Sequence, residues 1–426
     1  MTNSKNPETI GLHAGWRKDE NTNSVAVPIH ATSSYQFDNA DHAANLFALS
    51  ELGNIYSRIM NPTNAVLEER VAALEGGVGA LALASGQAAS SYAIQNLCVA
   101  GDNFVASSHL YGGTYNQFKN PFSDMGIEVR FVDPSDPQNF VKATDEKTRA
   151  YYGEVLPNPS FEVFPLEEVA ELGRPLGIPL IVDNTAAPVI CKPFEHGASV
   201  LLHSTTKFIG GHGNSIGCIL VDSGNFDWEK HPERQPKLNS PDPSYGGAIW
   251  TEAVKPLGPI AYILKARVTL LRDLGAAMSP FNAFMFLTGM ETLALRMKEH
   301  CKNAEKVRDF LKNHEKVERV IYPSEVATDR AKKYLKNGYG GLMGFEISGG
   351  REAGKKFINS LELLYHVANI GDSKSLAIHP ASTTHSQLSE SELTDAGVTP
   401  GFVRLSIGIE HIDDILADIE QALDSA

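Results

Sequence analysis

Leu-Ile-Val-Asp-Asn-Thr (180–185) and His-Ser-Thr-Thr-Lys-Phe-Ile-Gly-Gly (203–211) are the two stretches of sequence that decide the fold. The first reads as an apolar strand that ends in an acid, Asp183. The second follows the apolar run 199–202 and carries hydroxyls, Lys207 and glycines. Short apolar runs that end in polar loops are typical of buried parallel strands. Sheets of this kind bind ligands beyond the carboxyl ends of their strands, which is where the acid and the lysine fall.

The residue types at this place fit a cofactor that is bound through a lysine. A lysine that forms a Schiff base needs apolar surroundings, which lower its pKa, and a fixed position. Pyridoxal phosphate (PLP) also needs a carboxylate at its pyridinium nitrogen and hydroxyls at its phosphate. Asp183, Ser204, Thr206 and Lys207 offer all of these groups. The alternative is an acid that ends a buried strand before an ordinary polar loop, and this pattern alone leaves both hypotheses open.

The composition indicates a soluble globular protein. The chain has 426 residues, of which 42% are hydrophobic and 21% charged, and its formal net charge is −14. This charge argues against nucleic acid or an anionic membrane as a partner, because either would need a basic patch. No apolar run reaches about 18 residues, and the N-terminus has no apolar signal core. The cysteines, Cys98, Cys191, Cys218 and Cys301, form no Cys-X-X-Cys pair, which predicts free thiols in a reducing cytoplasm.

We expect three parts along the chain. They are a polar N-terminal arm (1–63), a large domain (64–275) and a smaller C-terminal α+β domain (276–426). The large domain begins with an amphipathic helix that has Pro62 near its start and Gly76 just past its end. The apolar strands predicted after this helix are 80–84, 103–107, 128–133, 150–156, 179–183, 199–203 and 218–222. Helical or loop segments separate most of them, which predicts an α/β fold with a mostly parallel seven-stranded sheet.

Several short motifs follow one another along the chain. They are Tyr-Ser-Arg-Ile-Met-Asn-Pro-Thr (56–63), Ala-Ser-Gly-Gln-Ala-Ala (84–89), Leu-Tyr-Gly-Gly-Thr (110–114), Pro-Asn-Pro (157–159), Val-Asp-Asn-Thr (182–185), Ser-Thr-Thr-Lys-Phe-Ile-Gly-Gly-His-Gly (204–213) and Val-Arg-Leu-Ser-Ile-Gly-Ile-Glu (403–410). With these motifs in this order, the chain resembles the Cys/Met-metabolism group of PLP enzymes. The resemblance extends from about residue 10 to residue 424. The resemblance implies the PLP-dependent transferase fold of type I and PLP as the cofactor.

The resemblance also implies roles for residues of the large domain. Lys207 would carry PLP, and Asp183 would hold its pyridinium nitrogen. Tyr111 would cover the ring face and assist proton transfer, and Asn158 would contact the ring hydroxyl and the substrate carboxylate. The phosphate would be bound by the amides of Gly86 and Gln87, at the start of a helix, and by the hydroxyls of Ser204 and Thr206. Without a ligand, the same residues read as a helix cap and a packed turn tyrosine.

Other implied roles fall outside the large domain. Tyr56 and Arg58, in the arm, would reach the phosphate of a neighbouring subunit, so the site would require a homodimer or homotetramer. Arg404 would bind the substrate carboxylate as a planar fork, with help from Ser375. On spacing alone, Arg404 reads equally well as a strand residue that faces water, and Arg58 reads more readily as a surface residue. His379 and His385 lack a third ligand at a recognised spacing, so no metal site is predicted.

Three features resemble the O-acetylhomoserine sulfhydrylases within this group. They are the opening Glu-Thr-Ile-Gly-Leu-His-Ala-Gly (8–15), the insertion between 224 and 260, and the segment Asn-Ile-Gly-Asp-Ser-Lys-Ser-Leu-Ala-Ile-His-Pro-Ala-Ser-Thr-Thr-His (369–385). The resemblance implies γ-replacement, in which O-acetyl-L-homoserine and sulfide give L-homocysteine and acetate. Lys374 stands where cystathionine-forming relatives often carry an acid, which favours sulfide. The alternatives are cystathionine γ-synthase, O-succinylhomoserine sulfhydrylase, methionine γ-lyase, or a catalytically silent PLP-binding scaffold.

Overall fold

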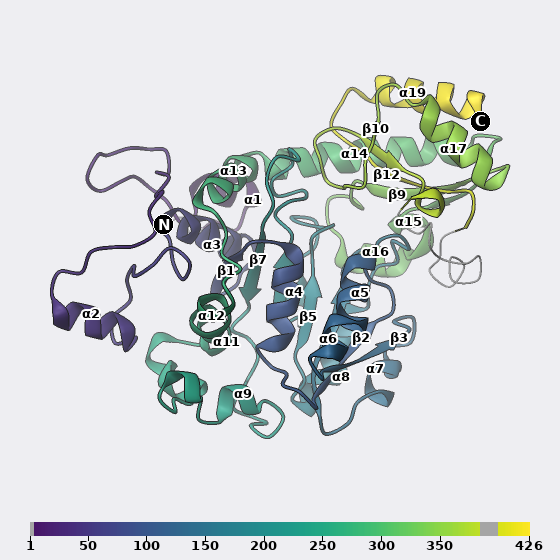
Figure 1. Cartoon of the computed structure of the whole chain (residues 1–426). Coiled ribbons are helices and arrows are strands. Elements are labelled where there is room, and N and C mark those ends of the chain that lie inside the picture. Colours follow the sequence, from purple (N-terminus) through teal and green to yellow (C-terminus); the bar gives the residue numbers. More distant parts are fainter. Residues whose placement is uncertain (1–3, 384–398) are drawn as a thin grey trace.

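A seven-stranded sheet forms the centre of the large domain in the computed structural model, which describes residues 4–383 and 399–426 (Figure 1). Its strand order is β1-β7-β6-β5-β4-β2-β3, and β7 alone runs antiparallel to its neighbours. The strands are β1 (Gly79–Leu83), β2 (Asn103–Ser107), β3 (Glu128–Val132), β4 (Thr148–Glu154), β5 (Leu180–Asp183), β6 (Val200–His203) and β7 (Cys218–Asp222). The predicted α/β fold with a mostly parallel sheet is therefore confirmed.

Helices cover both faces of this sheet. On one face, α3 (Pro62–Glu75) begins after the cap residue Asn61 and ends at Gly76, which has a φ of 80°. A left-handed residue of this kind favours glycine, as the sequence predicted. On the other face, α4 (Gly86–Gln95) packs over β6 and β7. The further helices after α4 and up to residue 291 are α5 (Gly112–Lys119), α6 (Pro121–Asp124), α7 (Gln138–Lys142), α8 (Leu166–Gly173), α9 (Pro236–Asn239), α10 (Trp250–Ala253), α11 (Ala261–Lys265), α12 (Arg272–Leu274) and α13 (Pro280–Glu291), and α13 packs against α3 although it follows the predicted boundary at 275.

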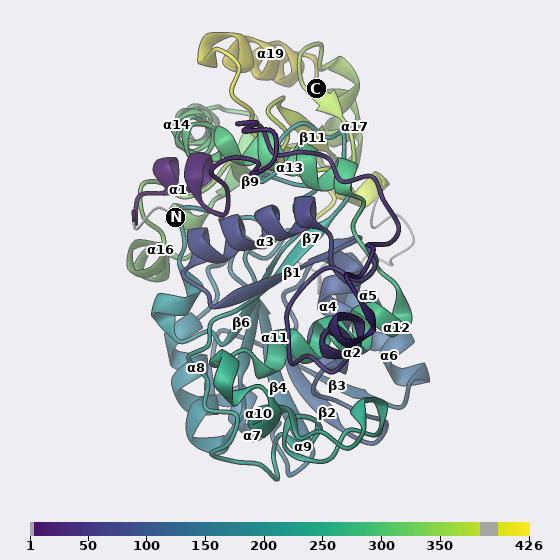
Figure 2. The same cartoon turned by 90° about the vertical axis from the view of Figure 1, so that its left-hand side faces the viewer.

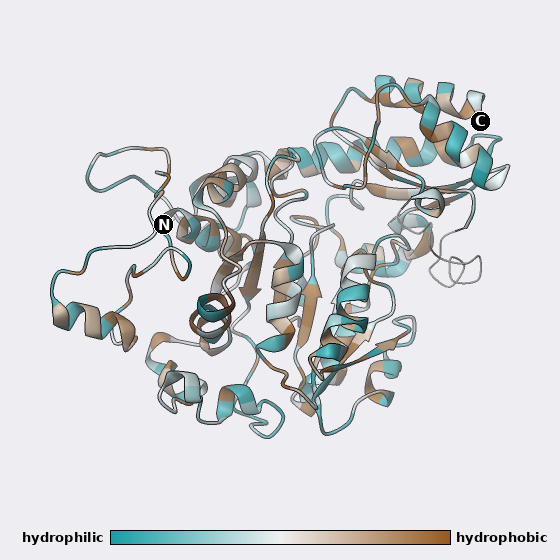
Figure 3. Ribbon diagram, in the orientation of Figure 1, coloured by the Kyte–Doolittle hydropathy of each residue, from teal (hydrophilic) through white to brown (hydrophobic). Residues whose placement is uncertain are grey.

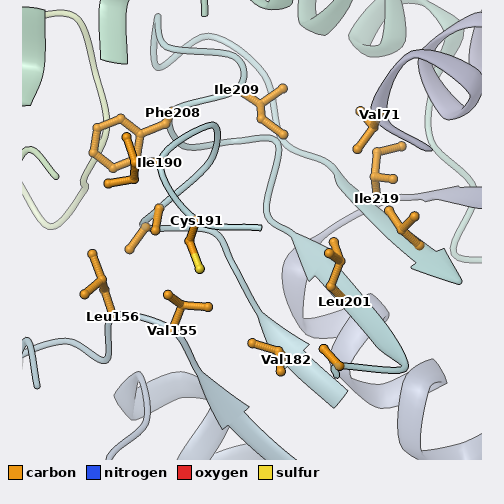
Figure 4. Packing of buried hydrophobic residues seen from close by; sticks show 14 of the residues in the cluster. Val71, Val155, Leu156, Val182, Ile190, Cys191, Leu201, Phe208, Ile209 and Ile219 are labelled. Atoms are coloured by element: carbon orange, nitrogen blue, oxygen red, sulfur yellow. The ribbon is translucent and has the colours of Figure 1, made fainter. Parts of the chain in front are cut away.

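Each face of the sheet has its own apolar core. Val71 of α3 belongs to the same buried cluster as Val182 and Leu201, which project from β5 and β6 (Figure 4). The next residue along β6, Leu202, belongs to the cluster on the α4 face. Side chains of a strand alternate between faces, so Asp183, one residue after Val182, projects toward the α4 face. This alternation decides on which side of the sheet the acid can act.

A second, smaller sheet has the strand order β10-β11-β12-β9-β8 and is antiparallel except between β10 and β11. Its strands are β8 (Val317–Ile321), β9 (Leu342–Ile347), β10 (Tyr365–His366), β11 (Leu376–Ile378) and β12 (Phe402–Ser406). Its helices are α14 (Leu293–Lys312), α15 (Pro323–Val326), α16 (Thr328–Tyr334), α17 (Gly350–Ser360) and α19 (Ile412–Ser425). Strands of both sheets are mostly brown and the outer helix faces mostly teal in Figure 3, as expected for two buried sheets.

The N-terminal segment is less irregular than the sequence suggested. Helix α1 (Pro7–His13) packs against α3, α13 and α14, because Gly11 allows close approach to the main-chain oxygen of Met290. Helix α2 (Ala40–Phe47) lies in a segment that extends away from the domain body in Figure 1. Large apolar side chains on this segment are exposed, among them Val25 and Leu52.

The small sheet lies above the large one when the molecule is turned (Figure 2). All four cysteines are free and buried, in agreement with the sequence prediction. Within residues 4–383 and 399–426, no helix is long and apolar enough to cross a membrane. Thr384 and His385, the last two residues of the segment 369–385, lie outside the described residues.

Candidate functional site

The polar residues of the site follow the carboxyl ends of three neighbouring parallel strands. Strand β4 ends in Glu154, β5 ends in Asp183, and β6 leads through His203 to Lys207. Because parallel strands end at the same edge of a sheet, these residues come together although they are distant in sequence. Two residues reach this edge from the side of the small sheet: Arg404, on β12, and Asn369, in the segment between β10 and β11.

Lys207 is the amine at the centre of this arrangement. Its Nζ donates a hydrogen bond of 2.6 Å to Oδ1 of Asn369. Burial and, to a smaller extent, the nearby guanidinium of Arg404 lower the pKa of Lys207 from 10.5 to about 8. Burial disfavours the ammonium form, and a like charge adds to this effect. The neutral, nucleophilic form of this amine is therefore much more populated near neutral pH than it would be at the ordinary pKa of 10.5.

Two carboxyl groups lie side by side under the α4 face. Glu154 and Asp183 are partners in register on β4 and β5. Burial raises the pKa of both groups, and Asp183 raises the pKa of Glu154 further. Hydrogen bonds from Thr185, including one of 2.8 Å from its amide to Oδ1, favour the ionised form of Asp183. The pKa of Glu154 is raised well above its ordinary range, whereas Asp183 receives two hydrogen bonds from Thr185 that favour its ionised form. Of the two, Asp183 is therefore the better suited to a cationic ring nitrogen.

The start of α4 offers an anion cradle. Ser85 caps the helix by accepting from the amide of Ala88, whereas the amides of Gly86 and Gln87 donate to no acceptor in the described part of the chain. A Cβ on Gly86 would lie 3.4 Å from Oγ of Ser204, so the missing side chain leaves the cradle open. Free first-turn amides beside a hydroxyl suit a phosphate.

The hydroxyl of Thr206 has a different environment. It donates to the main-chain oxygen of Gly217 over 3.2 Å and accepts from the amide of that residue over 3.0 Å. These bonds hold the turn that carries Lys207 against the start of β7. The predicted contact of Thr206 with a phosphate would use the remaining lone pair or a rearranged hydroxyl, and it stays a prediction.

Tyr111 and Asn158 follow the carboxyl ends of β2 and β4. Tyr111 precedes α5, its amide donates to Oε1 of Glu154 over 2.8 Å, and the residue is 52% exposed. A Cβ on Gly113 would come within 2.5 Å of the tyrosine ring, so the ring lies against the first turn of α5. Asn158 lies in the turn after β4, where the amide of Phe161 donates to the oxygen of Pro157. Both residues are thus at the edge that holds Asp183.

Arg404 is a buried cation with a free donor. It lies on β12, is 8% exposed, and donates through Nη2 to the main-chain oxygen of Asn369 over 2.9 Å. Its Nε is buried and donates to no acceptor among the residues described. Burial lowers the pKa of Arg404 to about 10. A buried guanidinium with an unsatisfied N–H is well suited to a carboxylate, which accepts through two oxygens.

Ser375 lies buried, and its hydroxyl is already engaged. It donates to Oε2 of Glu410 over 2.9 Å and accepts from the amide of Gly408 over 2.8 Å. Asn369, six residues earlier in the same segment, is the residue that contacts both Lys207 and Arg404. The predicted role of Ser375 at the substrate carboxylate stays a prediction, and its contacts favour a structural role.

Tyr56 and Arg58 stand together on the N-terminal arm. The guanidinium of Arg58 lies 5.3 Å from the centre of the Tyr56 ring, and Tyr56 is 41% exposed. Arg58 also lies against Gly275 and near Asp273. Among the described residues of one chain, the contacts of Tyr56 and Arg58 do not include Lys207. Their predicted reach into the site of a second copy is untested.

Three residues of the site were missed by the sequence reasoning. Asn369 and Arg296 both make contacts between segments that are distant in the sequence. Asn369 contacts Lys207. Arg296 of α14 donates to the main-chain oxygens of Phe208 and Ile209, just past Lys207. No local sequence pattern predicts contacts of this kind. Glu154 did have a signal, because it is an acid near the end of the predicted apolar strand 150–156 and shortly precedes Pro-Asn-Pro (157–159).

Comparisons with known proteins agree with this geometry. The family profile described as "Cys/Met metabolism PLP-dependent enzyme" matches residues 8–424. The chain is 54% identical to the O-acetyl-L-homoserine sulfhydrylase of Leptospira meyeri, over 99% of this chain and 98% of the relative. It is 47% identical to the homocysteine synthase of Schizosaccharomyces pombe, over 99% of each chain.

Two solved structures have the same architecture. An O-acetylhomoserine (thiol)-lyase of Campylobacter jejuni is 42% identical with a TM-score of 0.94, over 99% of this chain and all of the other, and carries a pyridoxyl-lysine phosphate at position 205 of its own chain. The metB protein of Corynebacterium glutamicum is 32% identical with a TM-score of 0.84, over 99% of this chain and 98% of the other.

Proposed function

Since the chain belongs to the Cys/Met metabolism family of PLP-dependent enzymes, we propose that it converts O-acetyl-L-homoserine and sulfide into L-homocysteine and acetate. In this γ-replacement the bond between Cγ and the ester oxygen breaks, and a bond between Cγ and sulfur forms. The acetyl group leaves as acetate, and hydrogen sulfide supplies the sulfur together with its remaining proton. The reaction needs no oxidant or reductant.

The residues present fit PLP. Lys207 offers an amine with a lowered pKa, Asp183 offers a carboxylate, and the free amides at the start of α4 offer an anion cradle. The chemistry that PLP supplies when bound is an electron sink for negative charge developing at Cα and Cβ of the substrate. The chain itself must supply binding, orientation and proton transfer.

We assign these tasks as follows. Lys207 would hold the cofactor covalently, and its free amine would take the Cα proton of the substrate and return a proton to the carbon chain. Asp183 keeps the ring nitrogen protonated, because its ionised form is favoured by Thr185. Arg404 binds the substrate carboxylate through its free Nε, and Asn369 holds Arg404 and Lys207 at a fixed separation. Gly86, Gln87 and Ser204 hold the phosphate.

We further propose that each site is completed by a second copy of the chain. Tyr56 and Arg58 stand on the arm that extends away from the domain body, and the exposed apolar side chains of that arm support a partner surface. A homodimer is the smallest assembly with complete sites, and a homotetramer would contain two such pairs. The division into an arm, a large domain and a small domain, and the cytoplasmic location, remain predictions.

The observation that carries the proposed function is the meeting of Lys207, Asn369 and Arg404 at the strand end that carries Asp183, in a chain 54% identical to a named sulfhydrylase. A paired assay tests it. Purified protein is given O-acetyl- or O-succinyl-L-homoserine, each with sulfide or with cysteine, and the products are identified by mass. Homocysteine from the acetyl ester and sulfide is the expected main product. Cystathionine as the main product or preference for the succinyl ester would replace the proposal by the corresponding alternative. A separate reaction with L-methionine alone tests the lyase alternative, which release of a thiol would support.

A further inference from the structure

The amide of Tyr111 is anchored by a buried carboxyl group that lies 43 positions away in the sequence. It donates over 2.8 Å to Oε1 of Glu154, which is 6% exposed. Tyr111 is the residue just before α5, and no side chain caps this helix. The carbonyl of Tyr111 accepts from the amide of Tyr115 within the first turn, so the bond to Glu154 is what ties the amide side of this residue to the sheet. The ring beyond this backbone is half exposed and lacks a buried setting of its own.

The contacts of the tyrosine ring join it to the rest of the site. Arg404, on the small sheet, interacts electrostatically with Tyr111. Gly113 gives the ring room, since a Cβ at that position would overlap it. A small change in the backbone at residue 111 would therefore move the ring relative to both Arg404 and Asp183, because the ring extends well beyond its anchor point.

We propose that Glu154 is a positioning residue, whose carboxyl oxygen fixes the backbone at Tyr111 and thereby sets where the tyrosine ring stands relative to Arg404. The inference rests on the proposed function for the task that Tyr111 performs, but the anchoring itself can be measured without any turnover. Glu154 acts here through Tyr111, and it is given no contact with the substrate.

The setting of Glu154 indicates that it acts by shape and hydrogen bonding rather than by charge. It lies in register beside Asp183, and Tyr152 and Tyr111 are its further neighbours. Two adjacent buried carboxylates repel each other, and burial and Asp183 raise the pKa of Glu154 well above its ordinary range. A neutral carboxyl group has nearly the shape of an amide, and the Oε1 of a glutamine accepts an N–H in the same way.

This setting gives a pair of informative variants. Glu154→Gln keeps the acceptor and removes the ability to ionise. Glu154→Met keeps the length of the side chain, fills the same space and has no comparable acceptor, so it leaves the Tyr111 amide without its partner. Glu162→Gln is the matched control, because Glu162 lies 3.9 Å from His109 near the same loop and makes no recorded bond to Tyr111.

The experiment measures hydrogen exchange of the peptide around Tyr111 in the full-length protein as purified, together with the circular dichroism of the bound cofactor and with kcat and KM. In Glu154→Met we expect exchange at residue 111 to be about tenfold faster and kcat/KM to fall about 10- to 100-fold, the range for an unpaired buried donor. Glu154→Gln should recover most of both losses. Tyr111→Ala keeps the backbone amide and removes only the ring. In this background Glu154→Met should lower kcat/KM by less than about threefold more, because no ring is left to position.

The outcomes that contradict the inference are distinct from those that contradict the proposed function. Unchanged exchange in Glu154→Met, or equal damage in the Gln and Met variants, would overturn the anchoring role. Full additivity with Tyr111→Ala would do the same. If Glu154→Met does not fold, Glu154→Gln still tests the anchoring role. This variant keeps the acceptor, so fast exchange at residue 111 in it would contradict the role. A wild-type protein that fails to bind PLP would sink the proposed function, while the exchange comparison would still test the anchor.

Discussion

The Nζ of Lys207 lies 2.6 Å from the Oδ1 of Asn369, in a hydrogen bond that joins the edge of the large sheet to the small sheet. The main-chain oxygen of the same asparagine accepts from Arg404. One residue thus sets the separation between the amine that would carry the cofactor and the cation that would bind the substrate. Because the amide of Asn369 is neutral, it holds the amine without offsetting the burial that lowers its pKa.

The first prediction concerns the charge of Asn369. Asn369→Asp places a negative charge beside Lys207, which favours the ammonium form and raises its pKa. The amine must be neutral to capture PLP, so the capture rate of the cofactor-free protein should rise with pH around 8 in the wild type and at a higher pH in the variant. Capture rates measured across pH 6–10 would check this. An unchanged pH midpoint of PLP capture in Asn369→Asp would contradict the contact between residue 369 and Lys207. Asn313→Asp, on the surface at the end of α14, is the control.

A second prediction follows from the buried amine itself. Lys207 has a pKa of about 8 in the folded chain and an ordinary value of 10.5, so the unfolded chain binds more protons between these pH values. The cost of burying this amine is thus present in full below pH 8 and disappears as the pH rises toward 10.5. Lys207→Met should stabilise the cofactor-free protein by ~2 kcal/mol at pH 7, less at pH 10. Urea unfolding of both proteins at both pH values measures this, and a variant that is less stable at pH 7 would refute it.

The third prediction concerns the covalent attachment. Lys207 follows an apolar strand, lies beside Ser204 and has the lowered pKa that attachment requires. Reduction of the protein with borohydride, followed by peptide mapping, should place the label on Lys207. Lys265 is a stringent control, because it is also buried and has a pKa lowered to about 7, yet it lies behind α4 against Asn96. A label on Lys265 or on another lysine would show that Lys207 does not carry the cofactor.

The strands were predictable because burial dictates their composition. Runs such as Leu180–Asp183 are apolar on both faces and can satisfy their backbone only within a sheet, so their number and their parallel arrangement could be inferred. Lys207 and Asp183 were predictable for a related reason: the ends of such strands share one edge. Asn369 was not, because its contact with Lys207 joins segments 162 positions apart and depends on how the two sheets meet.

The interpretation of Ser375 illustrates the same limit. Ser375 and Asn369 lie in one polar segment, and the sequence does not indicate which of its residues turns toward the large sheet. The fold decides this through Glu410, which accepts from both the amide and the hydroxyl of Ser375 and holds it in the small domain. Helix α1 likewise depends on a tertiary contact, the approach of Gly11 to Met290.

The fourth prediction is that each site is shared between subunits. Arg58→Ala and Lys207→Ala should each abolish most activity. Mixed dimers of the two variants should recover part of it, because one of their two sites receives both intact residues. Unfolding and refolding the variants together, with differently tagged chains, yields such dimers for assay. No recovery in isolated mixed dimers would show that Arg58 acts within its own chain, next to Gly275 and Asp273.

The last prediction is that Arg404 binds the substrate carboxylate and that lysine cannot replace it. The Nε of Arg404 is buried without an acceptor, and Nη2 is held by Asn369, so the guanidinium has a fixed plane and a free donor. A charge-assisted contact of this kind contributes roughly 1.5–3 kcal/mol, so Arg404→Ala should lower kcat/KM by about 10- to 100-fold. Arg404→Lys keeps a charge but loses the planar fork, and it should recover only part of the loss.

The cofactor separates this role from a structural one. Arg404 donates its hydrogen bond to Asn369, and its relation to Lys207 and Tyr111 is electrostatic, so both variants should keep the visible absorbance of bound PLP. Removing the guanidinium also removes a like charge near Lys207, which should raise the pKa of that amine and move the pH dependence of PLP capture upward. Kinetics and absorbance of the two variants are measured side by side. Wild-type kinetics in Arg404→Ala would falsify the role of Arg404 in binding the substrate carboxylate. Loss of the visible absorbance in either variant would indicate that Arg404 helps to bind PLP instead.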